Sequence, residues 1–220
     1  QWRDGLTGGS GGPTRQTLLR VTTDAEIDGI VWLRNDAISR DLVERVIAPT
    51  FLGADPLMRE DLWFRMWELD RLEEFPMYAL GYLDMAAWDI SAKAAGVPAY
   101  KFMGGHKARA KAYASTVTVE TQDDYLRLAD DCLARGYRAI KLHVWGRIHE
   151  DIRLVHALRK HVGPDVELML DGSAGYTLEE SIRLGRAMEE ADYLWLEEPM
   201  REFSLYAYQR LCDTLDIAIL

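Results

Sequence analysis

The spacing of apolar residues divides the chain into two parts with different rhythms. In the first part, two apolar runs, residues 17–24 and 28–33, are separated by a short polar turn, which predicts an antiparallel pair of strands. From residue 36 to about residue 96, apolar positions recur every three or four residues, and breaks near residues 48–56 and 73–76 predict three helices. We therefore expect an α+β unit of about 100 residues here.

Two of these helices carry clear local signals. The middle helix is expected to begin after Asp55, with Pro56 in its first turn, where the missing N–H of proline costs nothing. The third helix has one apolar stripe at steps of three and four residues, formed by Leu80, Leu83, Ala87, Ile90 and Ala94. Gly96 and Pro98 are expected to end it.

After Gly104 and Gly105 the chain alternates regularly between apolar strands and amphipathic helices. The expected strands are residues 111–116, 139–144, 166–171, 193–198 and 217–220. The expected helices are residues 123–136, 149–163, 178–191 and 204–215. Such alternation predicts parallel strands with right-handed crossovers, as in a (β/α) barrel or a doubly wound sheet. No glycine-rich phosphate loop follows any expected strand, which favours the barrel.

Composition and charge narrow the class of protein. The 220 residues are 48% hydrophobic and 28% charged, as is typical of a globular chain. A net charge of -10 provides no basic surface for nucleic acid or anionic lipid. No run approaches the ~18 apolar residues of a membrane span, and Cys132 and Cys212 lack the spacing of a zinc or redox site. We expect a cytoplasmic protein that binds neither nucleic acid nor membranes.

Two carboxylates stand at the ends of neighbouring expected strands. Asp171 ends the third strand of the alternating region and Glu197 lies at the end of the fourth, so both would reach the same edge of a parallel sheet. Two acids at the end of buried strands repel each other unless a cation neutralises them. Oxygen ligands without cysteine or histidine at ligand spacing favour Mg²⁺ over zinc.

Lys141 and His143 alternate with apolar residues on the strand before these acids. A half-exposed strand would show the same alternation at no cost, because successive side chains point to opposite faces. In an all-parallel barrel, however, the face that carries both residues is the interior. Beside a divalent cation, positive neighbours and partial burial would favour the neutral forms of both side chains, as a general base requires. The sequence therefore predicts a base next to a metal-bound anion.

Four segments together resemble the enolase superfamily, in its mandelate racemase and muconate lactonizing enzyme branch. These segments are LDMAAWDISAKAAGVPAYKFMGG, IKLH, LMLDGS and WLEEPM. The resemblance implies an α/β fold in which a partial α+β capping domain, residues 1–105, precedes the first half of a (β/α)8 barrel, residues 106–220. It also implies a Mg²⁺-dependent enzyme that removes the proton α to the carboxylate of a small-molecule substrate, with the metal stabilising the enediolate.

The resemblance assigns roles by position. Asp171 and Glu197 would be the first and second Mg²⁺ ligands. His143 takes the place of the second lysine of the family's common Lys-x-Lys motif and would be the base, while Lys141 would be its electrostatic partner and contact the substrate carboxylate. Ser173 stands where the family often has asparagine, and would hydrogen-bond a ligand or water in the substrate site.

The expected lid and loop segments point to the substrate class. By resemblance, residues 1–16 and 32–35 would cover the barrel mouth, and Arg34 would meet an anionic or hydroxylated substrate group. Trp145, just past His143, would wall the site. These polar candidates and the hydroxyl-rich loop of residues 171–177 favour an acid-sugar dehydratase. A racemase, epimerase or cycloisomerase of the same superfamily, and a non-catalytic binding protein on the same fold, are the alternatives.

Several expected parts of such an enzyme are missing from the sequence. The chain begins without Met and stops within an expected strand at Leu220. The third metal ligand and the Asp–His pair of the later strands would follow that residue, and the first strand of the capping domain would precede residue 1. We expect a fragment that is inactive alone, from a protein that is a homo-oligomer.

Overall fold

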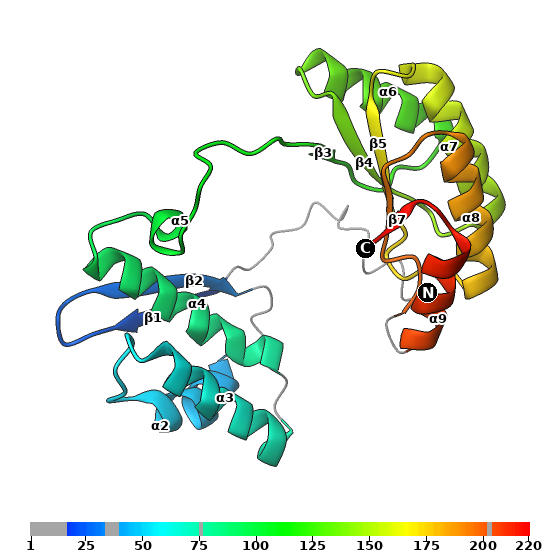
Figure 1. The fold of residues 1–220 in the computed structure, drawn as a ribbon. Helices are drawn as coiled ribbons and strands as arrows, with labels where there is room; N and C mark the ends of the chain where they lie inside the picture. The colour runs from blue at the N-terminus through cyan, green and yellow to red at the C-terminus, as the bar shows by residue number, and fades with distance from the viewer. Residues whose placement is uncertain (1–16, 34–39, 75–76, 202–203) are drawn as a thin grey trace. The chain divides into compact units, whose positions relative to one another are not determined.

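The computed structural model describes residues 17–33, 40–74, 77–201 and 204–220. The chain divides into two compact units, with the boundary between Arg109 and Ala110 (Figure 1). None of the described helices has the length and apolar character that a membrane crossing requires.

The first unit is an antiparallel strand pair with helices. Strands β1, Thr17–Thr22, and β2, Asp28–Leu33, pair in the register that sets Thr17 opposite Leu33, as the sequence predicts. The helical elements are a π-helical turn at Val43–Ile47, α2 at Ala48–Phe51, α3 at Arg59–Glu73, α4 at Met77–Ala94 and α5 at Ala99–Phe102.

Helix α3 begins later than the sequence predicts. Pro56 lies in a turn before the helix rather than in its first turn. The Asp55 carboxylate accepts a hydrogen bond from the Leu57 amide at 2.9 Å, and the Asp55 carbonyl accepts one from the Met58 amide. An aspartate that bonds the backbone two residues ahead stabilises a turn, and this delays the start of the helix to Arg59.

The apolar stripe of α4 packs on the strand pair. Leu80, Leu83, Ala87 and Ile90 are buried, whereas Ala94, the last residue of the helix, is exposed. The closest approach is at Gly29 of β2, where an added Cβ would lie 2.4 Å from the Ala86 carbonyl oxygen. Only glycine allows the helix to approach the strand so closely.

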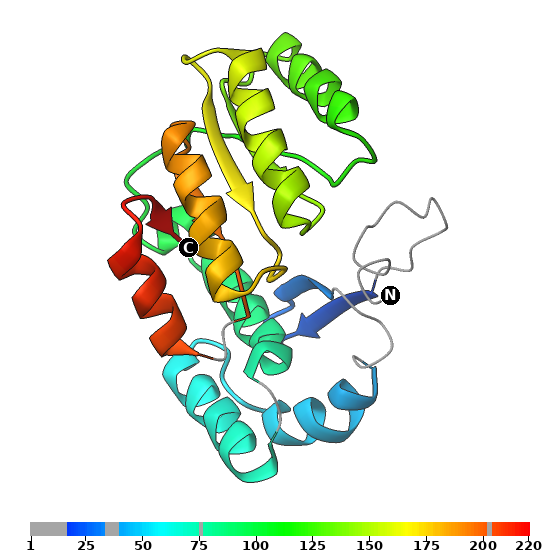
Figure 2. The same cartoon turned by 90° about the vertical axis from the view of Figure 1, so that its right-hand side faces the viewer.

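The second unit confirms the alternating pattern. Its strands are β3 at Ala114–Ser115, β4 at Ala139–His143, β5 at Glu167–Asp171, β6 at Trp195–Glu197 and β7 at Ala218–Ile219, all parallel and in sequence order within one sheet. The helices between them are α6 at Gln122–Ala134, α7 at Ile148–Val162, α8 at Leu178–Glu190 and α9 at Leu205–Thr214. Consecutive helices of this set pack side by side (Figures 1 and 2).

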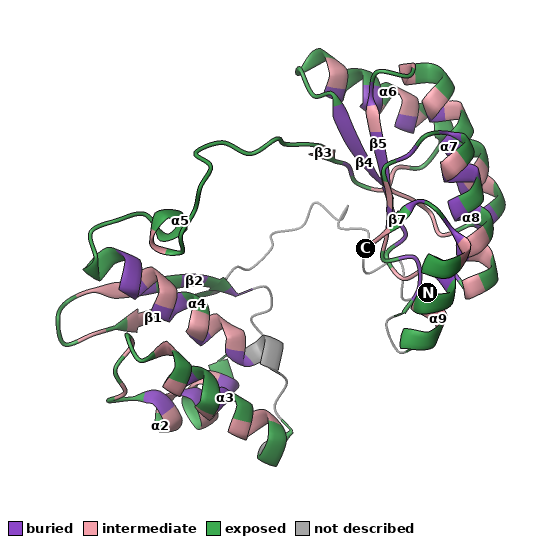
Figure 3. Ribbon diagram, in the orientation of Figure 1, coloured by how far each residue is buried: buried purple, intermediate pink, exposed green. Residues whose placement is uncertain are grey.

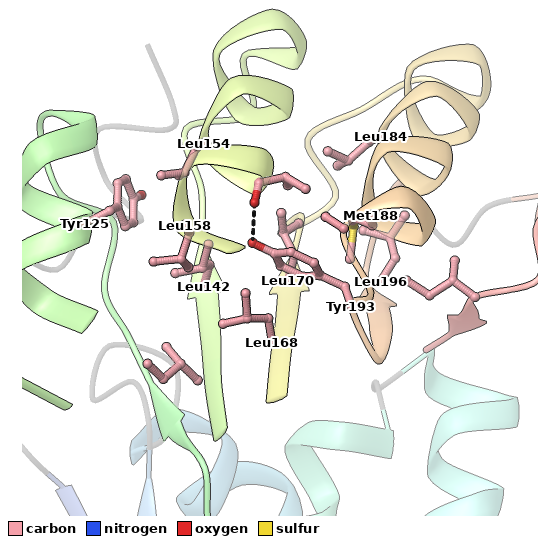
Figure 4. Close-up of a cluster of buried hydrophobic side chains, with 14 of the residues drawn as sticks. Tyr125, Leu142, Leu154, Leu158, Leu168, Leu170, Leu184, Met188, Tyr193 and Leu196 are labelled. Atoms are coloured by element: carbon pink, nitrogen blue, oxygen red, sulfur yellow. Dashed lines mark hydrogen bonds between the residues drawn. The ribbon is translucent and has the colours of Figure 1, made fainter. Parts of the chain in front are cut away.

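The core of the second unit lies between the sheet and these helices. Alternate strand residues, among them Leu142, Leu168 and Leu170, are fully buried against the helices (Figures 3 and 4). Lys141 and His143 alternate with these residues and therefore take the opposite face of β4. The period of two thus assigns one face of the sheet to the helix-side core, and the other face carries Lys141, His143 and Asp171 together with Ala139 and Met169.

Candidate active site and metal centre

Three polar side chains end three adjacent strands at one level. His143, Asp171 and Glu197 are the last residues of β4, β5 and β6. The register pairs His143 with Asp171, and Asp171 with Glu197. Since the strands are parallel, the three residues meet at the carboxyl edge of the sheet, which is where barrel enzymes carry their chemistry.

Lys141 joins the two carboxylates. Its Nζ atom donates to Oε1 of Glu197 at 2.8 Å and to Oδ2 of Asp171 at 3.2 Å. The side chains of Lys141 and Asp171 are only 8% and 7% exposed. Both carboxylates therefore point at one location on the face opposite the helices.

The two carboxylates favour the charged form of Lys141. Burial lowers the pKa of Lys141, but the hydrogen bonds with Glu197 and Asp171 outweigh burial and raise the pKa above its ordinary value. The expectation of a neutral lysine concerns the site with a divalent cation bound, and it stays a prediction.

Each carboxylate is oriented through its second oxygen. Oδ1 of Asp171 accepts from the backbone amide of Ser173 at 2.9 Å and from its hydroxyl at 3.3 Å. Oε2 of Glu197 accepts from Nε1 of Trp195 at 3.0 Å. These neutral donors fix one oxygen of each acid and leave Oδ2 and Oε1 facing the shared point.

His143 stands between a carboxylate and a backbone carbonyl. Its Nε2 lies 3.1 Å from Oδ2 of Asp171, and its Nδ1 lies 2.6 Å from the carbonyl oxygen of Thr116. Both neighbours are acceptors, so each ring nitrogen that carries a proton donates it: Nδ1 to the Thr116 carbonyl and Nε2 to Asp171. Thr116 in turn donates its amide and hydroxyl to the Lys141 carbonyl, at 2.9 and 3.0 Å.

Sequence reasoning missed Thr116 and the aromatic pair of Tyr113 and Trp195. The two rings meet edge to face with centroids 5.6 Å apart, and Nζ of Lys141 lies 5.8 Å from the Tyr113 ring. An ammonium group at that distance is attracted to the ring face. The available signal was strand alternation, because Trp195 shares the parity of Glu197 and is out of phase with buried Leu196.

Trp145 lies away from this site. Its indole nitrogen donates to the Val119 carbonyl at 2.6 Å, and its ring packs edge to face on Tyr125 of α6 at 5.1 Å. The chain turns after β4, so residue 145 no longer follows the strand's alternation and faces the helix-side core. The geometry therefore does not support the expectation that Trp145 walls the substrate site, and Arg34 lies outside the described residues.

The hydroxyl groups of the loop after β5 are used internally. Ser173 bonds Asp171, the Tyr176 hydroxyl donates to Asp151 at 2.8 Å, and the Thr177 hydroxyl lies in the capping box of α8. The loop therefore does not offer the free hydroxyls that suggested a sugar contact.

The donor set fits Mg²⁺ in part. Within the described residues no group of three or more His, Cys, Asp or Glu side chains forms a metal cluster. Asp171 and Glu197 nevertheless supply two carboxylate oxygens directed at one place, and Mg²⁺ in proteins is often held by one or two carboxylates with water completing its shell.

Comparison with known proteins identifies the family. The chain matches the mandelate racemase / muconate lactonizing enzyme N-terminal domain over residues 6–104 and the enolase C-terminal domain-like family over residues 124–220. It is 29% identical to arabinonate dehydratase of Saccharolobus solfataricus, over 80% of this chain and 49% of the relative. It is 35% identical to 3,6-anhydro-alpha-L-galactonate cycloisomerase of Streptomyces coelicolor, over 72% of this chain and 45% of the relative.

A solved structure agrees with these sequence matches. The crystal structure of D-glucarate dehydratase from Agrobacterium tumefaciens complexed with magnesium superposes with a TM-score of 0.86 and 31% identity, over 94% of this chain and 59% of that chain. The present chain spans about half the length of the curated relatives it matches. The predicted fold class, a partial (β/α)8 barrel after a partial capping domain, is confirmed. The chain belongs to the mandelate racemase/muconate lactonizing enzyme branch of the enolase superfamily.

Proposed function

We propose that this chain is part of a Mg²⁺-dependent enzyme that abstracts the proton α to the carboxylate of an acid sugar and dehydrates it. The observation that carries the proposal is the convergence of Asp171, Glu197, Lys141 and His143 at one edge of the sheet. Relatives named arabinonate dehydratase and L-talarate/galactarate dehydratase support the substrate class.

Asp171 and Glu197 would hold the metal ion. Oδ2 of Asp171 and Oε1 of Glu197 both lie against Nζ of Lys141 and so point at one location. The other oxygen of each acid is fixed by Ser173 or Trp195. Bound there, Mg²⁺ supplies positive charge where the substrate carboxylate gains negative charge as the α proton leaves. Fixing the ligand oxygens in advance reduces the cost of rearranging them during the reaction.

His143 is the base in this proposal. In the form that acts as base, Nδ1 keeps its proton on the Thr116 carbonyl, and the lone pair of Nε2, which lies 3.1 Å from Oδ2 of Asp171, accepts the α proton. The ring is 30% exposed at the edge of the sheet, so a substrate can reach it.

Lys141 is the electrostatic partner. Its amine lies between the acids, and the positive charge of its protonated form favours binding of the substrate carboxylate and of the anion formed by proton loss. The hydroxyl on the neighbouring carbon then leaves as water, with a proton equivalent to the one that His143 removed. The enol that remains tautomerises to a 2-keto acid, so the overall reaction is a dehydration.

Deuterium exchange tests the proposal. The protein encoded by the complete gene is incubated with Mg²⁺ and a panel of sugar acids in D₂O, and we expect deuterium at the α carbon or a keto-acid product. A His143→Gln variant should lose at least about 10²-fold in this rate. The matched control is His149→Gln, an exposed histidine on α7, which should keep it. No exchange with any acid would refute the proposal.

Cycloisomerisation is the second candidate. The relative with 35% identity is named a cycloisomerase, as is D-galactarolactone cycloisomerase of Agrobacterium fabrum at 31%. The first step, α-proton abstraction, is shared, and the product distinguishes the two activities. A cycloisomerase conserves the mass of its substrate, whereas a dehydratase releases one water per turnover.

A further inference from the structure

Asp151 is a completely buried carboxylate that the proposed mechanism does not use. It lies in the first turns of α7 and has 0% exposure. Its Oδ1 accepts from the Trp145 amide at 3.2 Å, and its Oδ2 accepts from the Arg147 amide at 2.5 Å and from the Tyr176 hydroxyl at 2.8 Å. Burying a charge is costly even when it is paired, and an apolar residue could fill the same space at lower cost. A role beyond stability would account for it.

The donors to Asp151 come from the two loops that follow the strands of the site. Trp145 and Arg147 belong to the loop that begins directly after His143, and Tyr176 belongs to the loop that begins after Asp171. A single carboxylate therefore ties together the segments that carry the proposed base and the first proposed metal ligand.

Tyr176 also contacts the backbone that follows each of the two proposed metal ligands. A Cβ added at Gly172, the residue after Asp171, would lie 3.0 Å from the Tyr176 ring, so the ring packs directly on this backbone. The Tyr176 amide donates to the Pro199 carbonyl at 3.0 Å, in the segment after β6. Tyr176 is itself buried at 6% exposure.

The start of α7 differs from those of its neighbours. Helices α6 and α8 begin with capping boxes, Thr121 with Asp124 and Thr177 with Glu180, that lie at the surface. The N-cap residue of α7, Arg147, makes no side-chain cap, and the inward-facing Asp151 satisfies its amide instead. Two helices of this unit therefore begin with a capping box at the surface, whereas α7, beside the site, begins with a hydrogen bond to a buried carboxylate.

We propose that Asp151 and Tyr176 are a positioning pair, which sets the spacing between His143 and Asp171 by holding the loops that follow them. This inference rests on the proposed function, since it concerns the geometry of the same base and ligand. Neither residue touches the reacting atoms. Because a misplacement of about 1 Å can cost about 10²-fold in rate, loosening the pair slows the chemical step more than it weakens substrate binding.

The test compares Tyr176→Phe with Thr177→Ala in the protein encoded by the complete gene. The first variant removes one hydroxyl and its bond to Asp151, and the second removes the exposed cap at the next residue of the same loop. We expect Tyr176→Phe to lower kcat for α-deuterium exchange about 10- to 100-fold with KM changed less than about threefold. Thr177→Ala should leave both constants near those of the wild type.

A second readout does not depend on turnover. The ¹⁵N resonances of the His143 ring, assigned by their loss in His143→Gln, should shift in Tyr176→Phe and stay in place in Thr177→Ala. Asp151→Asn should repeat the Tyr176→Phe result, because its amide group can accept only through one oxygen where the carboxylate accepts through two.

The outcomes separate this inference from the proposed function. A wild-type protein without exchange would refute the proposed function, and the ring resonances would still decide whether the pair positions His143. Equal effects of Tyr176→Phe and Thr177→Ala on kcat, or unchanged ring resonances in Tyr176→Phe, would overturn the inference. If Asp151→Asn does not fold, the tyrosine variant alone decides.

Discussion

Lys141 of β4 reaches across β5 to bind Glu197 of β6, with 2.8 Å between Nζ and Oε1. On the way its ammonium group also contacts Asp171 of the intervening strand. Three neighbouring strands are thus linked by one positive charge on the face away from the helices. The same charge offsets the repulsion between the two acids.

Replacing Lys141 by Met should destabilise the protein in the presence of a chelator. Without the ammonium group, two largely buried carboxylates face each other, and we expect the free energy of unfolding to fall by about 3–5 kcal/mol. Added Mg²⁺ should restore part of this loss, because a bound cation replaces the missing charge. Urea denaturation with EDTA and then with Mg²⁺ measures both effects.

The control for this variant is Lys111→Met. Lys111 pairs with Glu167 in the same unit, but its side chain is 68% exposed, so its loss should cost no more than about 1 kcal/mol. If the free energy of unfolding fell equally in Lys141→Met and Lys111→Met, the buried ammonium group would contribute no more to stability than a surface ion pair.

Replacing Trp195 by Phe should weaken Mg²⁺ binding. The substitution keeps an aromatic ring near Tyr113 but removes the N–H that fixes Oε2 of Glu197. Loss of a hydrogen bond that orients a metal ligand typically costs about 10-fold or more in affinity. In a Mg²⁺ titration followed by thermal shift, the Mg²⁺ concentration at the midpoint should rise by about the same factor. Trp145→Phe is the matched control, since it removes an indole N–H on the helix side of the sheet, and its midpoint should not change.

The sequence predicts the site as far as strand periodicity extends. Alternation along β4 separates Ile140 and Leu142, which are buried in the core, from Lys141 and His143 on the other face. The ends of adjacent parallel strands lie at one edge of the sheet. The positions of His143, Asp171 and Glu197 at the ends of consecutive strands are therefore enough to predict that they lie side by side.

Sequence patterns failed where the chain leaves regular structure. Trp145 has the parity of His143, but the turn after β4 reverses its direction. Asp151 looks in sequence like an ordinary exposed charge in the first turn of a helix. The helical period does not reveal that Tyr176, in the loop after another strand, covers it. Thr116 follows a two-residue strand, so its contacts to His143 and Lys141 depend on the register between strands rather than on any local pattern.

Glu189 should make stability depend on pH. Burial raises the pKa of Glu189, but hydrogen bonds from Arg186 and from the amides of Ile217 and Asp216 outweigh burial and lower its pKa below the ordinary 4.5. A lowered folded-state pKa gives stability that is present above about pH 4.5 and is lost as pH falls through the folded value. The unfolding free energies of wild type and Glu189→Gln should differ by about 1–2 kcal/mol at pH 7, and the difference should shrink as the pH falls below about 4.5. Glu179→Gln, at an exposed position of the same helix, should show no such convergence.

Arg159 should stabilise the amino edge of the sheet, away from the chemistry. Its guanidinium donates to four backbone carbonyls at 2.7–2.8 Å, those of Gly163, Val166, Ala191 and Asp192. A lysine cannot reproduce this planar fork, so Arg159→Lys leaves carbonyls without partners and should lower the free energy of unfolding by about 2–4 kcal/mol.

The activity of Arg159→Lys separates stability from chemistry. Since Arg159 binds the segment before β5 and the end of α8 rather than the carboxyl edge, kcat per folded molecule should match the wild type. Arg153→Lys, at an exposed position of the same helix, should change stability by no more than about 0.5 kcal/mol. A lowered kcat in folded Arg159→Lys would mean that the two edges of the sheet are mechanically coupled, and that the barrel strands transmit strain from one end to the other.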